Sequence, residues 1–159
     1  MPRQFMSPEA QVFWRYIAGS IDRLVELVEQ CPIDVVRWSP PAPGANPIAV
    51  LARHTLSNAE ENVLGVLTGR AVQRDRETEF GAAVLDRDPI VLAWRELHPR
   101  LEAALAALEA RDLEAAVAHP RRGPITGREV LIVVARHAAE HLGQAELTRD
   151  LAVAALARR

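Results

Sequence analysis

Three prolines that each follow a helix-capping residue constrain the fold of this chain more than any other feature of the sequence. They stand in the dipeptides Ser7-Pro8, Asn46-Pro47 and Asp88-Pro89. A polar side chain before proline is typical of a helix start, because the side chain accepts an early backbone N–H and proline tolerates the first helical position. A fourth start is predicted at Thr126, since Thr126-Gly-Arg-Glu129 has the pattern of a capping box.

Apolar residues recur at helical spacing after each of these starts. The predicted helices run from Pro8 to about Val28, from Pro47 to Thr68 with Gly69 as the stop, from Pro89 to Leu108, and from Gly127 to about Ala155. The sequence contains no alternating pattern typical of strands. The expected fold is therefore all-α: a four-helix bundle in one domain over residues 1–159, with a long crossover between helices two and three.

The two longest connections differ in composition. Pro40, Pro41 and Pro43 predict that residues 33–45 form a loop without helix or strand, in which Trp38 covers one end of the bundle. Residues 70–85 are rich in charge, which predicts a solvated crossover. A basic side chain in this crossover could instead reach an anionic ligand.

Pro99 lies inside the third helical pattern and is expected to kink that helix or split it near Leu97-His98. His98 is a minor candidate for a metal ligand at this kink. Residues 113–117 predict a short turn, and residues 119–124 predict the last loop. His119 precedes a proline there and is expected to be exposed.

Composition limits the classes of protein to which the chain can belong. A hydrophobic fraction of 49% over 159 residues is enough for a sizeable core. The formal net charge of −2 predicts no nucleic-acid partner. Cys31 is the single cysteine, so no internal disulfide can form. Neither a signal peptide nor a stretch of membrane-spanning length is visible, which predicts a cytoplasmic protein without a membrane partner.

His137 and His141 stand four residues apart in the fourth predicted helix. At about 100° per residue they share a face with Gln144 and with valines one turn earlier, so this face is expected to point into the protein. Such a pair can supply two metal ligands, and a third must come from another helix. His54 is the best candidate, because it lies mid-helix beside an apolar face. The alternative is that these are hydrogen-bonded core or surface histidines.

Polar residues accompany the candidate ligands on the same helices. Asn58 and Glu61 follow His54 on one stripe, while Glu140 and Gln144 accompany the pair. These residue types orient imidazoles around metal ions. Three neutral imidazoles leave coordination positions open, so that a bound metal could activate water or polarise a carbonyl. Glu61 and Glu140 are the candidate bases for such chemistry.

The stretch His137-Ala-Ala-Glu-His141-Leu-Gly-Gln144 resembles the closing motif of the DinB-like superfamily, which has two histidines separated by three residues, then one residue and Gly-Gln. The Trp- and Pro-rich segment 38–47, followed by His54, is similar to a loop and a lone histidine of that family. Residues 74–80 resemble an Arg- and acid-bearing segment of some members. The resemblance covers roughly residues 7–155. Leu142 is a departure, because many relatives have a basic residue there.

The resemblance implies a four-helix bundle, commonly a homodimer, in which His54, His137 and His141 hold a divalent metal ion. Zinc or nickel is the first expectation for that metal, with iron as a further candidate. The superfamily is related to mycothiol-dependent maleylpyruvate isomerase and bacillithiol transferase. The resemblance therefore implies a thiol-dependent S-transferase or isomerase that uses a low-molecular-weight thiol and a small-molecule substrate.

Two other functions remain open at this point. The first is a metal-dependent hydrolase that uses a metal-bound water. The second is a non-catalytic, stress-associated protein that binds metal or dimerises. Open metal positions in an enclosed pocket favour an enzyme, whereas a fourth protein ligand such as His98 would favour a structural site.

Overall fold

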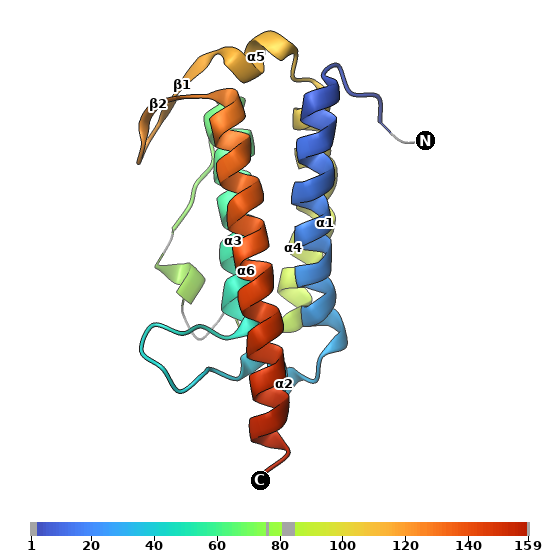
Figure 1. The fold of residues 1–159 in the computed structure, drawn as a ribbon, viewed down its shortest axis with the longest axis vertical. Coiled ribbons are helices and arrows are strands. Elements are labelled where there is room, and N and C mark those ends of the chain that lie inside the picture. Colours follow the sequence, from blue (N-terminus) through green and yellow to red (C-terminus); the bar gives the residue numbers. More distant parts are fainter. Residues whose placement is uncertain (1–2, 76, 81–84, 159) are drawn as a thin grey trace.

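The computed structural model describes residues 3–75, 77–80 and 85–158. Four long helical segments run side by side and enclose the core (Figure 1). They are α1 (Pro8–Gln30), α3 (Ile48–Ala59) with its continuation η1 (Glu60–Leu67), α4 (Arg87–Ala106) and α6 (Gly127–Leu156). The predicted all-α four-helix bundle is confirmed, and the long crossover connects η1 to α4.

The core lies between these four segments. Its largest fully buried side chains come from all of them: Ile17, Ile21, Leu24, Ile48, Leu64, Ile90, Leu101, Leu105 and Leu131. Burying one such side chain contributes about 1.5–3 kcal/mol relative to leaving it in water, so the apolar faces hold the helices together. Among the described residues, no helix combines the length and the apolar character needed to cross a lipid bilayer.

Two of the four predicted helix caps are confirmed. The Ser7 side chain accepts a hydrogen bond from the backbone N–H of Ala10. In the capping box, the Thr126 hydroxyl accepts from the backbone of Glu129, whose carboxylate accepts from the backbone of Thr126 at 2.7 Å. The predicted stop at Gly69 is also confirmed, since Gly69 has φ +68° and its N–H donates to the carbonyl of Gly65.

The other two predicted caps are wrong. Asn46 does not cap α3, because its side-chain amide donates to the carbonyl of Gly44. Helix α4 begins at Arg87, one residue before Asp88, and Asp86 occupies the cap position without capping. The Asp86 carboxylate is paired with Arg37 instead. The Gly44 carbonyl thus competes for the Asn46 side chain, whereas Asp88 cannot cap α4 because it lies inside the first turn of that helix.

The ends of the bundle carry short elements that the sequence did not reveal. The segment 33–45 was expected to be a loop throughout, but it begins with α2 (Ile33–Arg37). Its three prolines follow this helix, and Trp38 is partly buried against the core as expected. At the opposite end, α5 (Ala110–Glu114) crosses the top of the bundle (Figure 1).

A hairpin stands where only a turn and a loop were predicted. Strands β1 (Ala116–His119) and β2 (Gly123–Thr126) pair antiparallel, with Val117 opposite Ile125 and His119 opposite Gly123. The strands have four residues each, too few for a clear alternation of apolar and polar residues. The hairpin leads directly into α6 and brings His119 against η1.

Two helices differ from their predicted forms. Helix α4 continues through Pro99, so the predicted split is wrong. The buried Leu97 and Leu101 on either side of the proline anchor both halves of α4 in the core. The second predicted helix changes after Ala59 into the π-helix η1. Such π-helical turns are rare and often occur at functional sites.

Candidate metal centre

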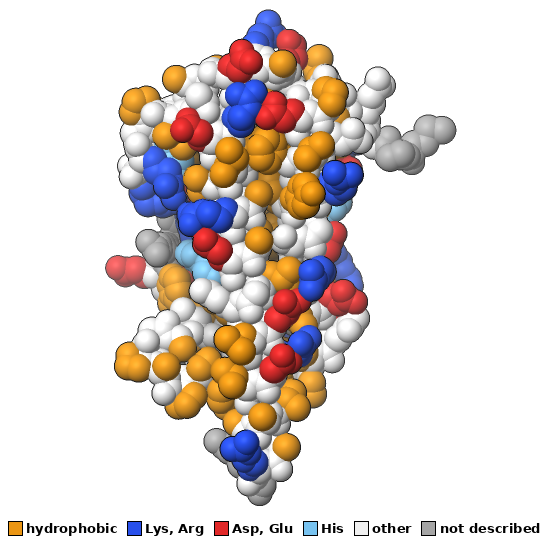
Figure 2. Space-filling model, viewed as in Figure 1, with side chains coloured by type: hydrophobic (Ala, Val, Ile, Leu, Met, Phe, Trp, Pro, Cys, Tyr) orange, Lys and Arg blue, Asp and Glu red, His pale blue; other side chains and the backbone are white. Residues whose placement is uncertain are grey.

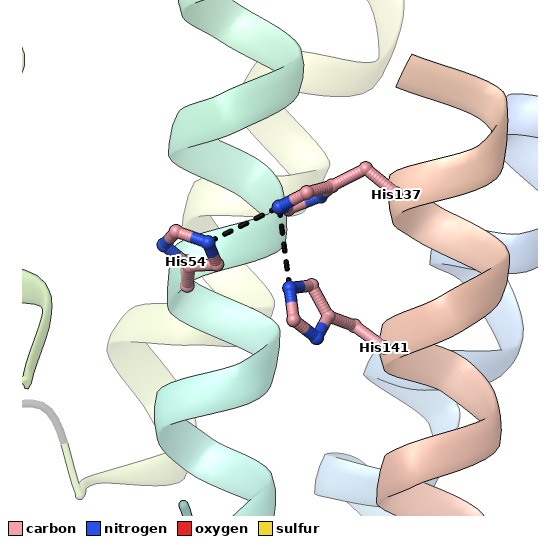
Figure 3. A group of neighbouring side chains, drawn as sticks. All are labelled: His54, His137 and His141. Atoms are coloured by element: carbon pink, nitrogen blue, oxygen red, sulfur yellow. Dashed lines mark hydrogen bonds between the residues drawn. The ribbon is translucent and has the colours of Figure 1, made fainter. Parts of the chain in front are cut away.

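Three imidazole rings meet between α3 and α6 near the middle of the bundle (Figure 3). Helix α6 places His137 and His141 one turn apart, and α3 places His54 opposite them. The Nε2 atom of His137 lies 3.1 Å from Nε2 of His54 and 3.2 Å from Nε2 of His141. All three candidate ligand atoms lie within 4.8 Å of one another. The fold thus brings together the three histidines chosen from the sequence.

The hydrogen-bond partners of Nδ1 in His54 and His141 favour one placement of the ring proton. Nδ1 of His54 contacts Oε2 of Glu79 at 2.7 Å, and Nδ1 of His141 contacts Oε1 of Gln144 at 2.7 Å. Both oxygens are acceptors, so these short contacts favour a proton on each Nδ1 and leave the lone pair of each Nε2 for the cluster. At His54 they outweigh the longer contact of Nδ1 with the donor Nη2 of Arg74, at 3.3 Å.

This donor set fits a divalent metal ion. Three nitrogens bound at about 2.0–2.1 Å to one tetrahedral ion lie roughly 3.3–3.4 Å apart. The two Nε2–Nε2 distances of 3.1 and 3.2 Å are close to that spacing. The Nε2 lone pairs of His54 and His141 both face Nε2 of His137. Lone pairs this close repel each other unless a cation or a proton lies between them. Imidazole is a preferred ligand of zinc, nickel, copper and iron.

The protonation state of the three histidines also favours metal binding. Burial, together with the smaller effects of the neighbouring His141 and His54, lowers the pKa of His137 to about 3. Burial also lowers the pKa of His54, although its hydrogen bond to Glu79 opposes the shift. Both rings are therefore neutral at physiological pH, and a neutral imidazole is the form that binds metal.

The carboxylate that contacts Nδ1 of His54 belongs to a buried cluster of ion pairs. The Nε atom of Arg74 donates to Oε1 of Glu79 at 2.7 Å, and its Nη1 donates to Oε2 of Glu61 at 2.7 Å. The side chains of Arg74 and Glu79 are only 7% and 3% exposed. Burial alone would raise the pKa of Glu79, but hydrogen bonds from Arg74 and His54 hold it below its usual value. The prediction of a solvated crossover is thus wrong for these two residues.

The two carboxylates proposed as bases are both engaged by arginine. Oε2 of Glu61 accepts from Arg74 and from Arg121, each at 2.7 Å. Burial works to raise the pKa of Glu61, and these arginines lower it overall. Glu140 lies on the exposed side of α6, where Arg136 pairs with it at 2.9 Å. The carboxylate that touches a candidate ligand is Glu79, which sequence reasoning did not single out.

The two other histidines lie outside the cluster. His98 fits between the edges of Trp14 and Trp94, with ring-centre distances of 4.9 and 5.0 Å. His119 is only 4% exposed, so the expectation that it is exposed is wrong. Its Nε2 lies 3.0 Å from Oδ1 of Asn62, because the hairpin folds His119 back onto η1.

Replacing Glu79 with glutamine is expected to weaken metal binding about 10–100-fold, because a neutral amide holds the Nδ1 proton of His54 less firmly than a carboxylate. Competition against a chromogenic chelator would measure this change in affinity. Glu77→Gln is the matched control, since Glu77 is exposed and lies two residues away. An equal loss in both variants would contradict a specific role for Glu79.

Comparisons with known proteins identify the family of this chain and structures with a similar fold. A sequence profile described as the DinB superfamily matches residues 8–145. No curated protein matches the chain. Among solved structures, a conserved protein from Enterococcus faecalis is similar with TM-score 0.73 and 16% identity, over 91% of this chain and 96% of that one. A DinB-like protein from Bacillus cereus gives TM-score 0.70 and 16% identity, over 94% and 95%.

A third solved structure corrects one prediction. The colibactin self-resistance protein ClbS, in complex with double-stranded DNA, is similar with TM-score 0.64 and 12% identity, over 89% of this chain and 95% of that one. A protein with this fold can therefore bind duplex DNA. The expectation of no nucleic-acid partner, drawn from a net charge of −2, is wrong as an exclusion. Net charge averages over the surface and does not describe any single face.

Proposed function

Because the chain belongs to the DinB superfamily and gathers three imidazole nitrogens at one point, we propose that it binds a divalent metal ion through His54, His137 and His141. The convergence of the three Nε2 atoms carries this proposal. Zinc or nickel is the first expectation for nitrogen ligands of this kind, and iron follows.

We further propose that the metal-loaded protein is a thiol-dependent S-transferase or isomerase of the mycothiol or bacillithiol type. When bound, a divalent cation would supply positive charge that keeps a thiol deprotonated at neutral pH. Glu79 holds the proton on Nδ1 of His54, and Gln144 holds the proton on Nδ1 of His141. Among the described residues, no fourth histidine, cysteine or carboxylate joins the three histidines, which leaves room for a substrate group.

A thiol reaction is favoured over hydrolysis by the state of the neighbouring carboxylates. Hydrolysis by an activated water needs a general base within hydrogen-bond reach. In the described part of the chain, Glu61 and Glu79 are both held by arginine, and Glu140 pairs with Arg136 on the exposed side of α6. A thiol has a pKa near 8.5, so it needs less help from a base than water does.

A proposal about the quaternary structure accompanies the proposed activity. We propose one bundle domain that forms a homodimer through the last turns of α6. Leu147, Leu151 and Val153 lie there with 60%, 46% and 53% exposure, which is high for large apolar side chains.

The test is a conjugation assay on untagged protein loaded with zinc or nickel. Bacillithiol, mycothiol and cysteine would each be mixed with a chromogenic aryl chloride, and release of chloride and the thioether product would be followed. We expect acceleration by the loaded protein with one of the first two thiols, and none by metal-free protein or His137→Ala. Ester hydrolysis without any thiol would support the hydrolase instead. Stoichiometric metal without either activity would support the non-catalytic alternative.

A further inference from the structure

A cavity of about 160 Å³ opens beside His54 and His137, between η1, the hairpin, the crossover and α6. Four of its lining residues are arginines, and none of its described lining residues is acidic. These arginines come from three segments of the chain: Arg74, Arg121, Arg122 and Arg136. We call this space the arginine cavity. Guanidinium groups are the preferred partners of carboxylates and phosphates in proteins.

The carboxylates that pair with these arginines leave a positive charge in the arginine cavity. Glu61 and Glu79 bind Arg74, Glu61 also binds Arg121, and Glu140 binds Arg136. Arg122 forms no ion pair within the described part of the chain. Three carboxylates therefore face four guanidinium groups, and none of the three lines the cavity.

A buried amide without a partner points to a ligand in the same place. Asn58 lines the arginine cavity and is only 7% exposed, yet its Oδ1 has no hydrogen-bond partner among the described residues. Leaving such a group unpaired costs about 1–3 kcal/mol. A side-chain amide presents an acceptor, or a donor after a half-turn, so it can pair with a hydroxyl or an acid oxygen of a ligand.

The size of the arginine cavity limits the ligand. At about 30 Å³ per water molecule, 160 Å³ holds roughly five waters. This volume suits a carboxylate or phosphate with a few attached atoms. The cavity lining includes His54 and His137, so an anion held there lies beside the imidazole cluster.

The other side of the histidines has the opposite character. A groove of about 410 Å³, which we call the apolar groove, runs between the 40–46 loop and α6. It is lined by Pro40, Leu51, Leu147 and Leu151, and it includes His141 and Gln144. On the surface, histidine side chains lie between a group of basic residues and an extended hydrophobic area (Figure 2). The three histidines therefore separate a cationic space from an apolar one.

We infer that the arginine cavity binds the carboxylate or phosphate group of a small anionic ligand. A role for this anion as a reactant depends on the proposed function, whereas anion binding by the arginine cavity does not. In the proposed transferase, the bound group would be an acid group of the thiol or of the electrophile that the thiol attacks.

The test measures anion binding to metal-free protein by calorimetry at low ionic strength, with inorganic phosphate, malonate and neutral malonamide as probes. We expect saturable binding of at least one anion and no binding of malonamide. Arg122→Gln is expected to weaken anion binding about tenfold, because the variant loses one charge-assisted hydrogen bond to the anion. Arg95→Gln is the matched control, because Arg95 is exposed on α4 and lies outside the cavity lining.

Two kinds of outcome overturn the inference. Absence of saturable anion binding, or equal weakening in Arg122→Gln and Arg95→Gln, overturns the anion site. Tight binding of a short DNA duplex without binding of either small anion would instead identify this face as a nucleic-acid surface. Saturable anion binding by a parent protein that takes up neither zinc nor nickel would support the arginine cavity and reject the proposed function, so the two failures can be told apart.

Discussion

His137→Ala is expected to lose stoichiometric metal binding, with an affinity at least about 100-fold below that of the parent protein. His137 lies between the other two histidines, and its Nε2 is the nitrogen within 3.1 and 3.2 Å of theirs. Removing it therefore leaves two ligands on different helices. His54→Ala and His141→Ala are expected to act in the same direction. Elemental analysis of untagged protein after dialysis against zinc or nickel would measure the metal content per chain.

His98→Ala is the matched control for this experiment. It removes a histidine of the same chain that packs against Trp14 and Trp94 and lies outside the cluster. We expect His98→Ala to keep about one metal ion per chain, with the melting temperature recorded for every variant. Full metal content in His137→Ala, or equal loss in His98→Ala, would show that the three histidines are not the binding site.

Gly127→Ala is expected to destabilise the fold by on the order of 3 kcal/mol, because α6 begins in close contact with α5. A Cβ atom at Gly127 would lie 2.3 Å from the backbone oxygen of Asp112. Backbone would have to move to relieve this clash, and the hydrogen bond from the Gly127 N–H to the carbonyl of Ala115 would be strained. At roughly 3 °C per kcal/mol for a chain of this size, the melting temperature should fall by about 10 °C.

Gly143→Ala provides the contrast within the same helix. A Cβ at Gly143 meets no described atom within 4 Å, and the residue is exposed. Alanine is favoured over glycine in a helix interior by about 0.5–1 kcal/mol, so we expect a small rise in stability. Thermal unfolding followed by circular dichroism would compare the two variants. Similar stability of Gly127→Ala and the parent would refute the predicted clash.

The sequence alone determined features whose physical causes lie within one or two helical turns. The cap at Ser7 and the capping box at Thr126 depend on contacts three residues apart, and both are present. The pairing of His137 with His141 follows from helical geometry once the helix is known. The stop at Gly69 depends on the conformational freedom of a single residue. The bundle itself follows from apolar faces at helical spacing.

Features that depend on distant partners were decided only by the tertiary structure. Arg74 and Glu79 look like solvated residues of a charged crossover, yet they are buried because Glu61 and His54 lie opposite them. His119 is buried because a hairpin of two short strands folds it onto Asn62. A local pattern carries no information about which polar groups will meet across the bundle. The sequence therefore supplied the candidate ligands, whereas tertiary packing supplied their hydrogen-bond partners and the arginines around them.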